Sequence, residues 1–243
     1  MTIRGIAHRG FPTRYPENTI ASFQAALDAS YSHMELDVHL SKDGVPVVIH
    51  DQTINRTTNG KGKVNDYTVD ELKQFKAGDD GSETIPTLEE VFRLARGKIE
   101  ILVELKQCGP LYPGLEQKVI DTARKLDIAD QLIVTSFDHY ALVRTRELDR
   151  DIKIGLLMGG SSPCVFPFMK ELGSTYMSIP IAYLSEEYDR ICRDNGVQLI
   201  ARPVDTEEAM KKMLRFPDVL ASTNTLALWK QFVEANREIK LHN

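Results

Sequence analysis

Residues 99–148 read IEILVELKQCGPLYPGLEQKVIDTARKLDIADQLIVTSFDHYALVRTREL, and in this stretch short apolar runs alternate with amphipathic segments. The runs at 99–105 and 132–135 predict strands, and the segments at 115–126 and 139–148 predict helices. Strands that alternate with helices indicate a parallel sheet, because each helix carries the chain back to the edge where the strand began. The stretch therefore predicts two consecutive units of an α/β fold.

The same alternation continues on both sides of this stretch. Eight strand–helix units are predicted in total, and eight units in 243 residues favour a closed (β/α)8 TIM barrel over a doubly wound open sheet. The predicted strand and helix of each unit are 3–8 and 18–30, 34–40 and 87–96, 99–105 and 115–126, 132–135 and 139–148, 152–157 and 165–172, 176–179 and 186–195, 197–201 and 207–214, and 219–222 and 226–237.

One segment after the second predicted strand interrupts the alternation. A short strand is predicted at 46–50, and residues 51–86 are rich in Gly, Asn, Thr, Asp and Lys. A loop of this length is usually functional or locally structured. Thr87 and Glu90 are spaced as a capping box, which marks the start of the next helix. We therefore expect residues 1–243 to form a single TIM-barrel domain, with 51–86 as a small insertion over its C-terminal rim.

Charge and cysteine usage exclude several classes of protein. The net charge of −5 argues against a nucleic-acid partner, because a general nucleic-acid binder usually carries a basic face. Cys108, Cys164 and Cys192 are far apart and odd in number, so we expect free, buried thiols rather than disulfides or a zinc site. No apolar run approaches the ~20 residues that span a bilayer, and the first residues lack a signal-peptide core. The expected location is therefore the cytoplasm.

Histidine and charged side chains gather at the ends of the first three predicted barrel strands. The carboxyl ends of barrel strands meet at one face, so we expect these side chains to share a cavity. Residues two apart on a strand also point to the same face. The group consists of His8 and Arg9 on the first strand, Glu35 and Asp37 on the second, Glu104 and Lys106 on the third, and His50 at the end of the short strand.

These residue types suggest metal-assisted chemistry on an anion. Glu35, Asp37 and Glu104 offer hard oxygen ligands, which suit Mg²⁺ or Ca²⁺. A metal ion beside two cationic side chains suits a phosphate group whose charge grows in the transition state. Two histidines could then serve as acid and base, because imidazole titrates near neutral pH. Taken singly, each histidine could be structural, and a Glu and a Lys two residues apart on one strand could form a buried ion pair.

An ordered set of motifs resembles the glycerophosphodiester phosphodiesterase family. The resemblance is dense over residues 3–107 and thinner beyond. The motifs are AHRG at 7–10, PENT at 16–19, ELDV at 35–38, KDG at 42–44, VIHD at 48–51, RTT at 56–58, GKG at 60–62, ELK at 104–106 and SF at 136–137.

The resemblance implies a fold, a metal site and a substrate. It implies a TIM barrel with an insertion after the second strand, and a small-molecule glycerophosphodiester as substrate. A glycerol hydroxyl would attack phosphorus and expel the alcohol, and water would open the cyclic phosphate to give glycerol phosphate. The implied roles are one Mg²⁺ or Ca²⁺ on Glu35, Asp37 and Glu104, general acid and base at His8 and His50, and phosphate binding at Arg9 and Lys106. Apart from the resemblance, Phe137 at the end of its strand could form a wall of the glycerol site or belong to the core.

The C-terminal third departs from the family pattern. Many members carry WTVN after the seventh strand and GIITD near the eighth, where this chain has RPVD at 202–205 and VLASTN at 219–224. Arg202 could bind a second anionic group on the substrate, or it could point to solvent or pair with Asp205. Thr223 lies in the second altered motif. The alcohol or glycerol pocket is where we expect this chain to differ.

Two alternatives to this function stay open at this point. The first is a lysophospholipase-D-like or phosphoinositide-directed phosphodiesterase on the same scaffold. The second is a barrel that binds a phosphate ligand without catalysis. An apolar rim could admit a lysophospholipid tail, or it could form the contacts of a homodimer. The residues expected in this rim are Leu111, Tyr112, Leu115, Phe166 and Phe168.

Overall fold

Eight parallel strands form a closed barrel in the computed structural model, which describes residues 2–78 and 81–237. Each strand pairs with the next, and β1 pairs with both β2 and β11, which closes the sheet. The predicted TIM barrel is therefore confirmed. Its strands are β1 (Ile3–His8), β2 (Tyr31–Leu40), β6 (Glu100–Leu105), β7 (Leu132–Ser136), β8 (Lys153–Leu157), β9 (Tyr176–Pro180), β10 (Gln198–Arg202) and β11 (Leu220–Thr223).

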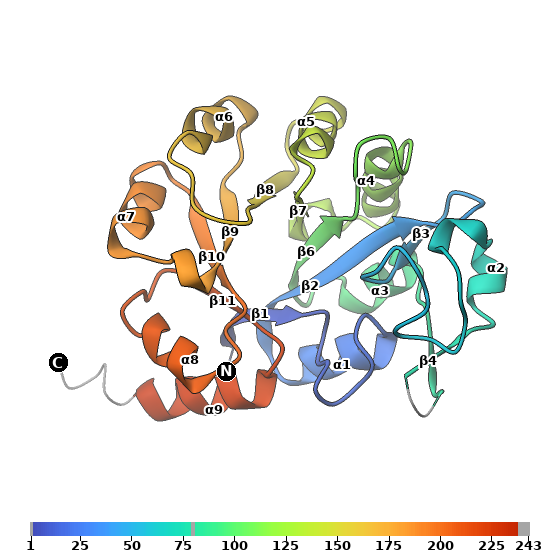
Figure 1. Ribbon diagram of the computed structural model, residues 1–243, viewed down its shortest axis with the longest axis horizontal. Coiled ribbons are helices and arrows are strands. Elements are labelled where there is room, and N and C mark those ends of the chain that lie inside the picture. Colours follow the sequence, from blue (N-terminus) through green and yellow to red (C-terminus); the bar gives the residue numbers. More distant parts are fainter. Residues whose placement is uncertain (1, 79–80, 238–243) are drawn as a thin grey trace.

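Helices surround the barrel (Figure 1). Four buried apolar residues of α3 lie on one helical face, so this face packs on the strands while the charged residues point outward. The larger helices are α1 (Ile20–Asp28), α3 (Leu88–Ala95), α4 (Leu115–Lys125), α5 (His139–Leu148), α6 (Val165–Leu172), α7 (Glu186–Asp194), α8 (Glu207–Met213) and α9 (Leu226–Arg237), and the short 3-10 helices η2 (Ala129–Gln131) and η3 (Ile181–Tyr183) lie between them.

Helix ends differ from the predicted ends where the backbone conformation forbids a helix. The first helix was expected over 18–30, with Asn18 or Thr19 as its N-cap. Asn18 has a φ of 58°, and Thr19 is the cap, since its side chain accepts a bond from Ser22 N. The predicted capping box is confirmed at α3. Thr87 Oγ1 accepts from Glu90 N at 3.2 Å, and the Glu90 carboxylate accepts from Thr87 N at 2.7 Å.

The barrel interior contains its own apolar layer. Ile6, Leu102, Ile133, Ile200 and Leu220 form one buried cluster, and they come from strands on opposite sides of the barrel. Side chains from such strands can meet only inside it. Alternate residues of a strand share a face, so the residues two positions after this layer point into the mouth at the carboxyl ends. They include His8 on β1 and Glu104 on β6.

The segment after β2 has a small apolar core of its own. β3 (Pro46–Val48) pairs antiparallel with β2 and ends two residues before the predicted strand end, so that His50 lies just beyond it. Figure 1 shows the segment beside β2 and α3. Its buried cluster is Val47, Ile49, Ile54, Val64, Leu72 and Ile85, and its elements are η1 (Val64–Asp66), α2 (Val69–Leu72), β4 (Lys76–Ala77) and β5 (Glu83–Thr84).

Two sequence expectations concern features away from the barrel mouth. In the part of the chain that the structure describes, no helix is long and apolar enough to cross a membrane. The three cysteines are free, as expected. The expectation that all three are buried is wrong, because Cys108 and Cys164 lie in exposed loops that precede α4 and α6, and Cys192 alone of the three is buried.

Candidate active site

A sharp turn at the end of β1 sets the positions of His8 and Arg9. Arg9 has a φ of 58° and Gly10 a φ of 84°, and a Cβ atom on Gly10 would lie 2.7 Å from the backbone carbon of Ser22. The Arg9 amide donates to both the carbonyl and the Oε2 atom of Glu35, each at 3.1 Å. The turn therefore ties the end of β1 to the first of the predicted acidic residues on β2.

Three carboxylates from two neighbouring strands form one acidic cluster. Asp37 on β2 lies opposite Glu104 on β6 in the strand register, and His8 lies opposite Glu35. One oxygen of each of Glu35, Asp37 and Glu104 lies within 4.8 Å of the others. The residues are 7%, 0% and 9% exposed, respectively. Strand register alone therefore brings together the predicted ligand set.

Two cationic side chains contact this cluster. Lys106 Nζ lies 3.0 Å from Asp37 Oδ1 and 2.6 Å from Glu104 Oε1, so the ion pair considered as an alternative is present within the cluster. Arg9 Nε lies 3.5 Å from Asp37 Oδ2, and Arg9 Nη1 donates to Glu17 at 3.1 Å. The structure thus brings both predicted phosphate-binding residues to the carboxylates.

The carboxylates carry more negative charge than these two cations balance. Burial raises the pKa of Glu35 well above its ordinary value, and repulsion from Asp37 and Glu104 adds to the effect. Burial likewise raises the pKa of Glu104. Burial opposes ionisation of Asp37 too, but Lys106, the two site histidines and Arg9 outweigh it and lower its pKa. Glu35 Oε1 is buried without a hydrogen-bond partner.

His8 lies beside the acidic cluster, and its imidazole also contacts a residue that directly follows β11, the strand on the other side of β1 from β2. Its Nε2 atom lies 3.7 Å from Glu35 Oε2, and its Nδ1 atom lies 2.7 Å from Asn224 Oδ1. Burial and the neighbouring Arg9 lower the pKa of the His8 imidazole. A neutral imidazole of this kind can accept a proton at neutral pH.

His50 is held by a carboxylate instead. Its Nδ1 atom lies 2.7 Å from Asp51 Oδ1, and its carbonyl oxygen lies 3.0 Å from Nε2 of the buried His39. Arg56 donates to Asp51 at 2.8 and 3.1 Å and to Glu17 at 2.7 and 2.9 Å. These Arg56 bonds, with His50, lower the pKa of Asp51 to about 2. The resulting network anchors the start of the insertion to the β1–α1 loop.

Arg202 and Phe137 lie together on the opposite side of the mouth. The Arg202 guanidinium carbon lies 5.0 Å from the centre of the Phe137 ring, which is 53% exposed, and Arg202 Nη2 donates to Met158 O at 2.9 Å. Burial lowers the pKa of Arg202, while attraction to Glu104 and Glu35 opposes the shift. The Asp205 carboxylate accepts instead from Thr223 and Asn224, so the structure does not pair it with Arg202. Ile200 of the same strand lies in the apolar layer inside the barrel, so Arg202, two residues further on, points into the mouth.

Several residues that hold the site were not predicted to do so. Asn18 Nδ2 donates to Asp37 Oδ2 at 2.8 Å, and the PENT motif was the available signal for this residue. Asp51, which contacts His50 Nδ1, could similarly have been found from its place in the VIHD motif. The contact between Asn224 and His8 could not be predicted from a motif, because 216 residues separate the pair and only the β1–β11 register brings them together.

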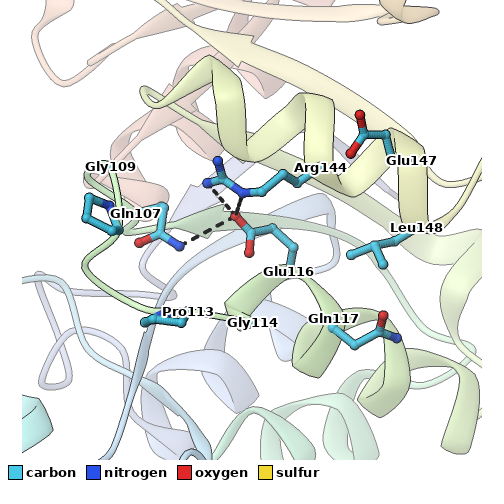
Figure 2. A pocket seen from close by; sticks show the side chains of 10 residues that line it. Gln107, Gly109, Pro113, Gly114, Glu116, Gln117, Arg144, Glu147 and Leu148 are labelled. Atoms are coloured by element: carbon cyan, nitrogen blue, oxygen red, sulfur yellow. Dashed lines mark hydrogen bonds and ion pairs between the residues drawn. The ribbon is translucent and has the colours of Figure 1, made fainter.

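Two of the cavities outside the acidic cluster are lined in part by charged side chains. One, of 630 Å³, lies between the β1–α1 loop and the insertion and is lined by Arg14, Glu17 and Arg56, among others. The other, of 570 Å³, lies outside the barrel between α4 and α5. Figure 2 shows that Arg144 from α5 and Gln107 are both directed at Glu116 on α4.

The apolar rim predicted from the sequence is largely absent from the surface. Tyr112, Leu115 and Phe166 are at most 7% exposed and belong to the main core between strands and helices. Leu115 and Phe166 pack inward because α4 and α6 need an apolar face against the barrel, and Tyr112, in the loop before α4, has its hydroxyl 2.8 Å from His39 Nδ1. The structure therefore gives little support to an acyl-chain groove or a dimer contact built from them.

Comparisons with known proteins agree in fold and family. A model of the glycerophosphoryl diester phosphodiesterase family matches residues 8–219. A glycerophosphodiester phosphodiesterase of Caldanaerobacter subterraneus subsp. tengcongensis is 39% identical over 86% of this chain and 89% of its own. A phosphodiesterase of Oleispira antarctica, solved with its product sn-glycerol-3-phosphate, is 27% identical, with a TM-score of 0.83 over 96% of this chain and 97% of its own. A glycerophosphodiester phosphodiesterase of Thermotoga maritima is 28% identical, with a TM-score of 0.76 over 97% and 99%.

Proposed function

The chain belongs to the glycerophosphoryl diester phosphodiesterase family, and from this premise we propose that it hydrolyses glycerophosphodiesters to an alcohol and glycerol 3-phosphate. We propose that His8 and His50 act as general acid and base, and that one divalent cation is required. The observation that carries the proposal is the gathering of His8, three carboxylates and two cations at one end of the barrel, with His50 directly after Ile49, whose amide donates to the Asp37 carbonyl at 3.0 Å.

The donor set fits a hard divalent cation. Three carboxylates converge within 4.8 Å, one of their oxygens is buried without a partner, and the pKa of Glu35 and of Glu104 is raised by burial and by the other carboxylates. Oxygen ligands of this kind suit Mg²⁺ or Ca²⁺. Held by Glu35, Asp37 and Glu104, the ion would supply Lewis-acid stabilisation of charge on the phosphate oxygens.

The two histidines would divide the proton transfers of a two-step reaction. In the first step, one imidazole removes the proton of a glycerol hydroxyl as its oxygen bonds to phosphorus. The other imidazole protonates the alcohol oxygen as the bond from that oxygen to phosphorus breaks. In the second step the roles reverse, and water opens the cyclic phosphate to glycerol 3-phosphate. The attacking hydroxyl belongs to the substrate itself, so it has the rate advantage of a pre-positioned nucleophile.

The remaining site residues would bind and select the substrate. Arg9 and Lys106 would bind the phosphate, since both already lie against the carboxylates. Phe137 would form a wall of the glycerol site. The Arg202 guanidinium faces the same mouth, which favours a diester whose alcohol carries further negative charge, and a phosphoinositide-directed activity is the second candidate for this reason.

The proposal extends to the organisation of the chain. Residues 1–243 would act as one catalytic domain, with 51–86 covering one side of the rim above His50. The cavity between this segment and the β1–α1 loop is open and polar, and it would accommodate the alcohol part of the substrate. The cytoplasm stays the proposed location, and a homodimer stays a proposal as well.

Hydrolysis of glycerophosphocholine tests the proposal. We expect glycerol 3-phosphate to form when Mg²⁺ or Ca²⁺ is supplied and the rate to fall to background after complete chelation. Activity that survives full chelation would refute the metal requirement. A lack of turnover with either metal and with anionic diesters, combined with measurable binding of glycerol phosphate, would favour a binding protein instead.

A further inference from the structure

A chain of hydrogen bonds connects His8, at the end of β1, to Asn224 after β11 and then to Asp205 after β10. His8 Nδ1 lies 2.7 Å from Asn224 Oδ1, and Asn224 directly follows β11, whose residue Thr223 lies opposite Ala7 in the register with β1. Asn224 Nδ2 in turn donates to Asp205 Oδ2 at 2.6 Å. His8 is thereby connected through one amide to a carboxylate that does not touch the acidic cluster's oxygens.

The orientation of the Asn224 amide is fixed by Asp205. This carboxylate also accepts from the Asn224 backbone amide at 2.7 Å and from Thr223 Oγ1 at 3.0 Å. An ionised carboxylate has no hydrogen to donate, so only the NH₂ end of the amide can face it. A flipped Asn224 would set its oxygen against Asp205 and its NH₂ group against the imidazole. Oδ1 of Asn224 must therefore face His8.

The fixed amide decides which imidazole nitrogen carries the proton. An acceptor oxygen opposite Nδ1 requires an N–H at that position, and a neutral imidazole then has its lone pair at Nε2. Nε2 is the atom on the side of Glu35. We propose that Asn224 and Asp205 are positioning residues that hold neutral His8 as the Nδ1–H tautomer, with the Nε2 lone pair presented to the cavity. The value of this arrangement for turnover rests on the proposed role of His8 as acid or base.

A swapped pair offers a sharp test. In the double variant Asn224→Asp/Asp205→Asn, a carboxylate would accept from His8 Nδ1–H and a new amide at 205 would donate to it. The acceptor opposite Nδ1 is kept although both side chains change. Asn224→Leu removes the acceptor with little change of size. Thr225→Val is the matched control, because its hydroxyl lies in the same turn and bonds Thr223 without reaching His8.

Two measurements read out the tautomer and its effect. In ¹⁵N spectra of histidine-labelled protein, the signals of His8 are assigned by their loss in His8→Gln. They should show a protonated Nδ1 and an unprotonated Nε2 in the wild type, the control and the swapped variant. Asn224→Leu should lose this single form. With metal present, Asn224→Leu should lower kcat for glycerophosphocholine by roughly 10- to 100-fold, part of the 10²–10⁴ that acid–base catalysis contributes, without raising KM. The swapped variant should recover most of that loss.

The outcomes separate this inference from the proposed function. A protonated Nε2 on neutral wild-type His8, or an Nδ1–H form that persists alone in Asn224→Leu, would overturn the positioning role. The positioning role would also be overturned if the swapped variant showed no larger fraction of the Nδ1–H form of His8 than Asn224→Leu shows. Loss of the tautomer in Asn224→Leu with unchanged kcat would leave the positioning role in place and would refute acid–base catalysis by His8.

Discussion

The two sides of this barrel mouth contribute different kinds of side chain. The side built from β1, β2, β6 and the insertion supplies both histidines, all three clustered carboxylates, and the two cations that contact them. The side built from β7 to β11 supplies Phe137, Arg202 and the amide of Asn224. Figure 1 shows these two sets of strands as opposite parts of one closed ring.

The difference separates the reaction from the choice of substrate. Charged groups that must act together have to lie within a few ångströms, and neighbouring strands in register achieve this most directly. Groups that select a substrate need only reach the mouth. We therefore expect changes on the first side to abolish chemistry, and changes at Phe137 and Arg202 on the second side to alter which diester is preferred, while Asn224 on that side acts on the reaction through His8.

The largest effect should come from the histidines of the first side. His8→Ala and His50→Ala should each lower kcat by roughly 10²–10⁴, because each removes a proton-transfer group. His139→Ala is the control from the second side, since His139 bonds only the carbonyl of Leu157 and stacks on Phe168. Steady-state rates with glycerophosphocholine measure this. A fully active His50→Ala variant would contradict the claim that the first side of the mouth carries the proton-transfer groups.

The next effect concerns metal affinity and stability together. Glu35→Gln should weaken Mg²⁺ or Ca²⁺ binding by at least roughly 10–100-fold, the loss typical even for groups that only support a ligand. Without metal, the same variant should unfold at a higher temperature than the wild type, because burial and repulsion from Asp37 and Glu104 raise the pKa of Glu35 and a neutral amide avoids both costs. Titration calorimetry and thermal denaturation in chelator measure the two changes. Unchanged metal affinity would remove Glu35 from the ligand set.

The sequence predicted the first side better than the second. Strand ends of a barrel converge whatever the details, so His8, Glu35, Asp37 and Glu104 could be grouped from spacing alone. The structure joins His8 to Asn224 through the register of β1 against β11, which no local pattern encodes. The family motifs suggested which residues of the first side bind metal, phosphate or protons. These motifs are dense only up to residue 107, so they say little about the second side.

The insertion was predicted only as a segment, and the physical reason is its small size. Its short elements, such as the four residues of α2, are too brief to show helical or strand periodicity. They are held by a local cluster that includes Ile54, Val64 and Leu72. Burial in such a cluster depends on contacts between loops, so no local pattern of residues predicts it.

A smaller effect should appear at Arg202. Arg202→Ala should lower kcat/KM for a diester with an additional phosphate about tenfold relative to glycerophosphocholine, the scale of one charge-assisted hydrogen bond. Arg215→Ala is the matched control, because Arg215 also lies over a phenylalanine ring, at Phe216, but has an exposed side chain. An unchanged ratio would show that the second side does not select for charge at this position.

The smallest effect should come from the link between the insertion and the β1–α1 loop. The pKa of Asp51 is lowered to about 2 in the folded chain, below the ordinary 3.8. The stabilisation by its Arg56 bonds is therefore full above about pH 4 and is lost as the pH falls toward 2. Arg56→Gln should cost at most about 1 kcal/mol at pH 7, since Arg56 is half exposed. Urea unfolding at pH 7 and pH 3 measures this, and the difference between the wild type and the variant should be smaller at the lower pH. A difference that stays the same at both values would mean that Arg56 acts through packing, and the insertion would then be joined to the first side by contact rather than by charge.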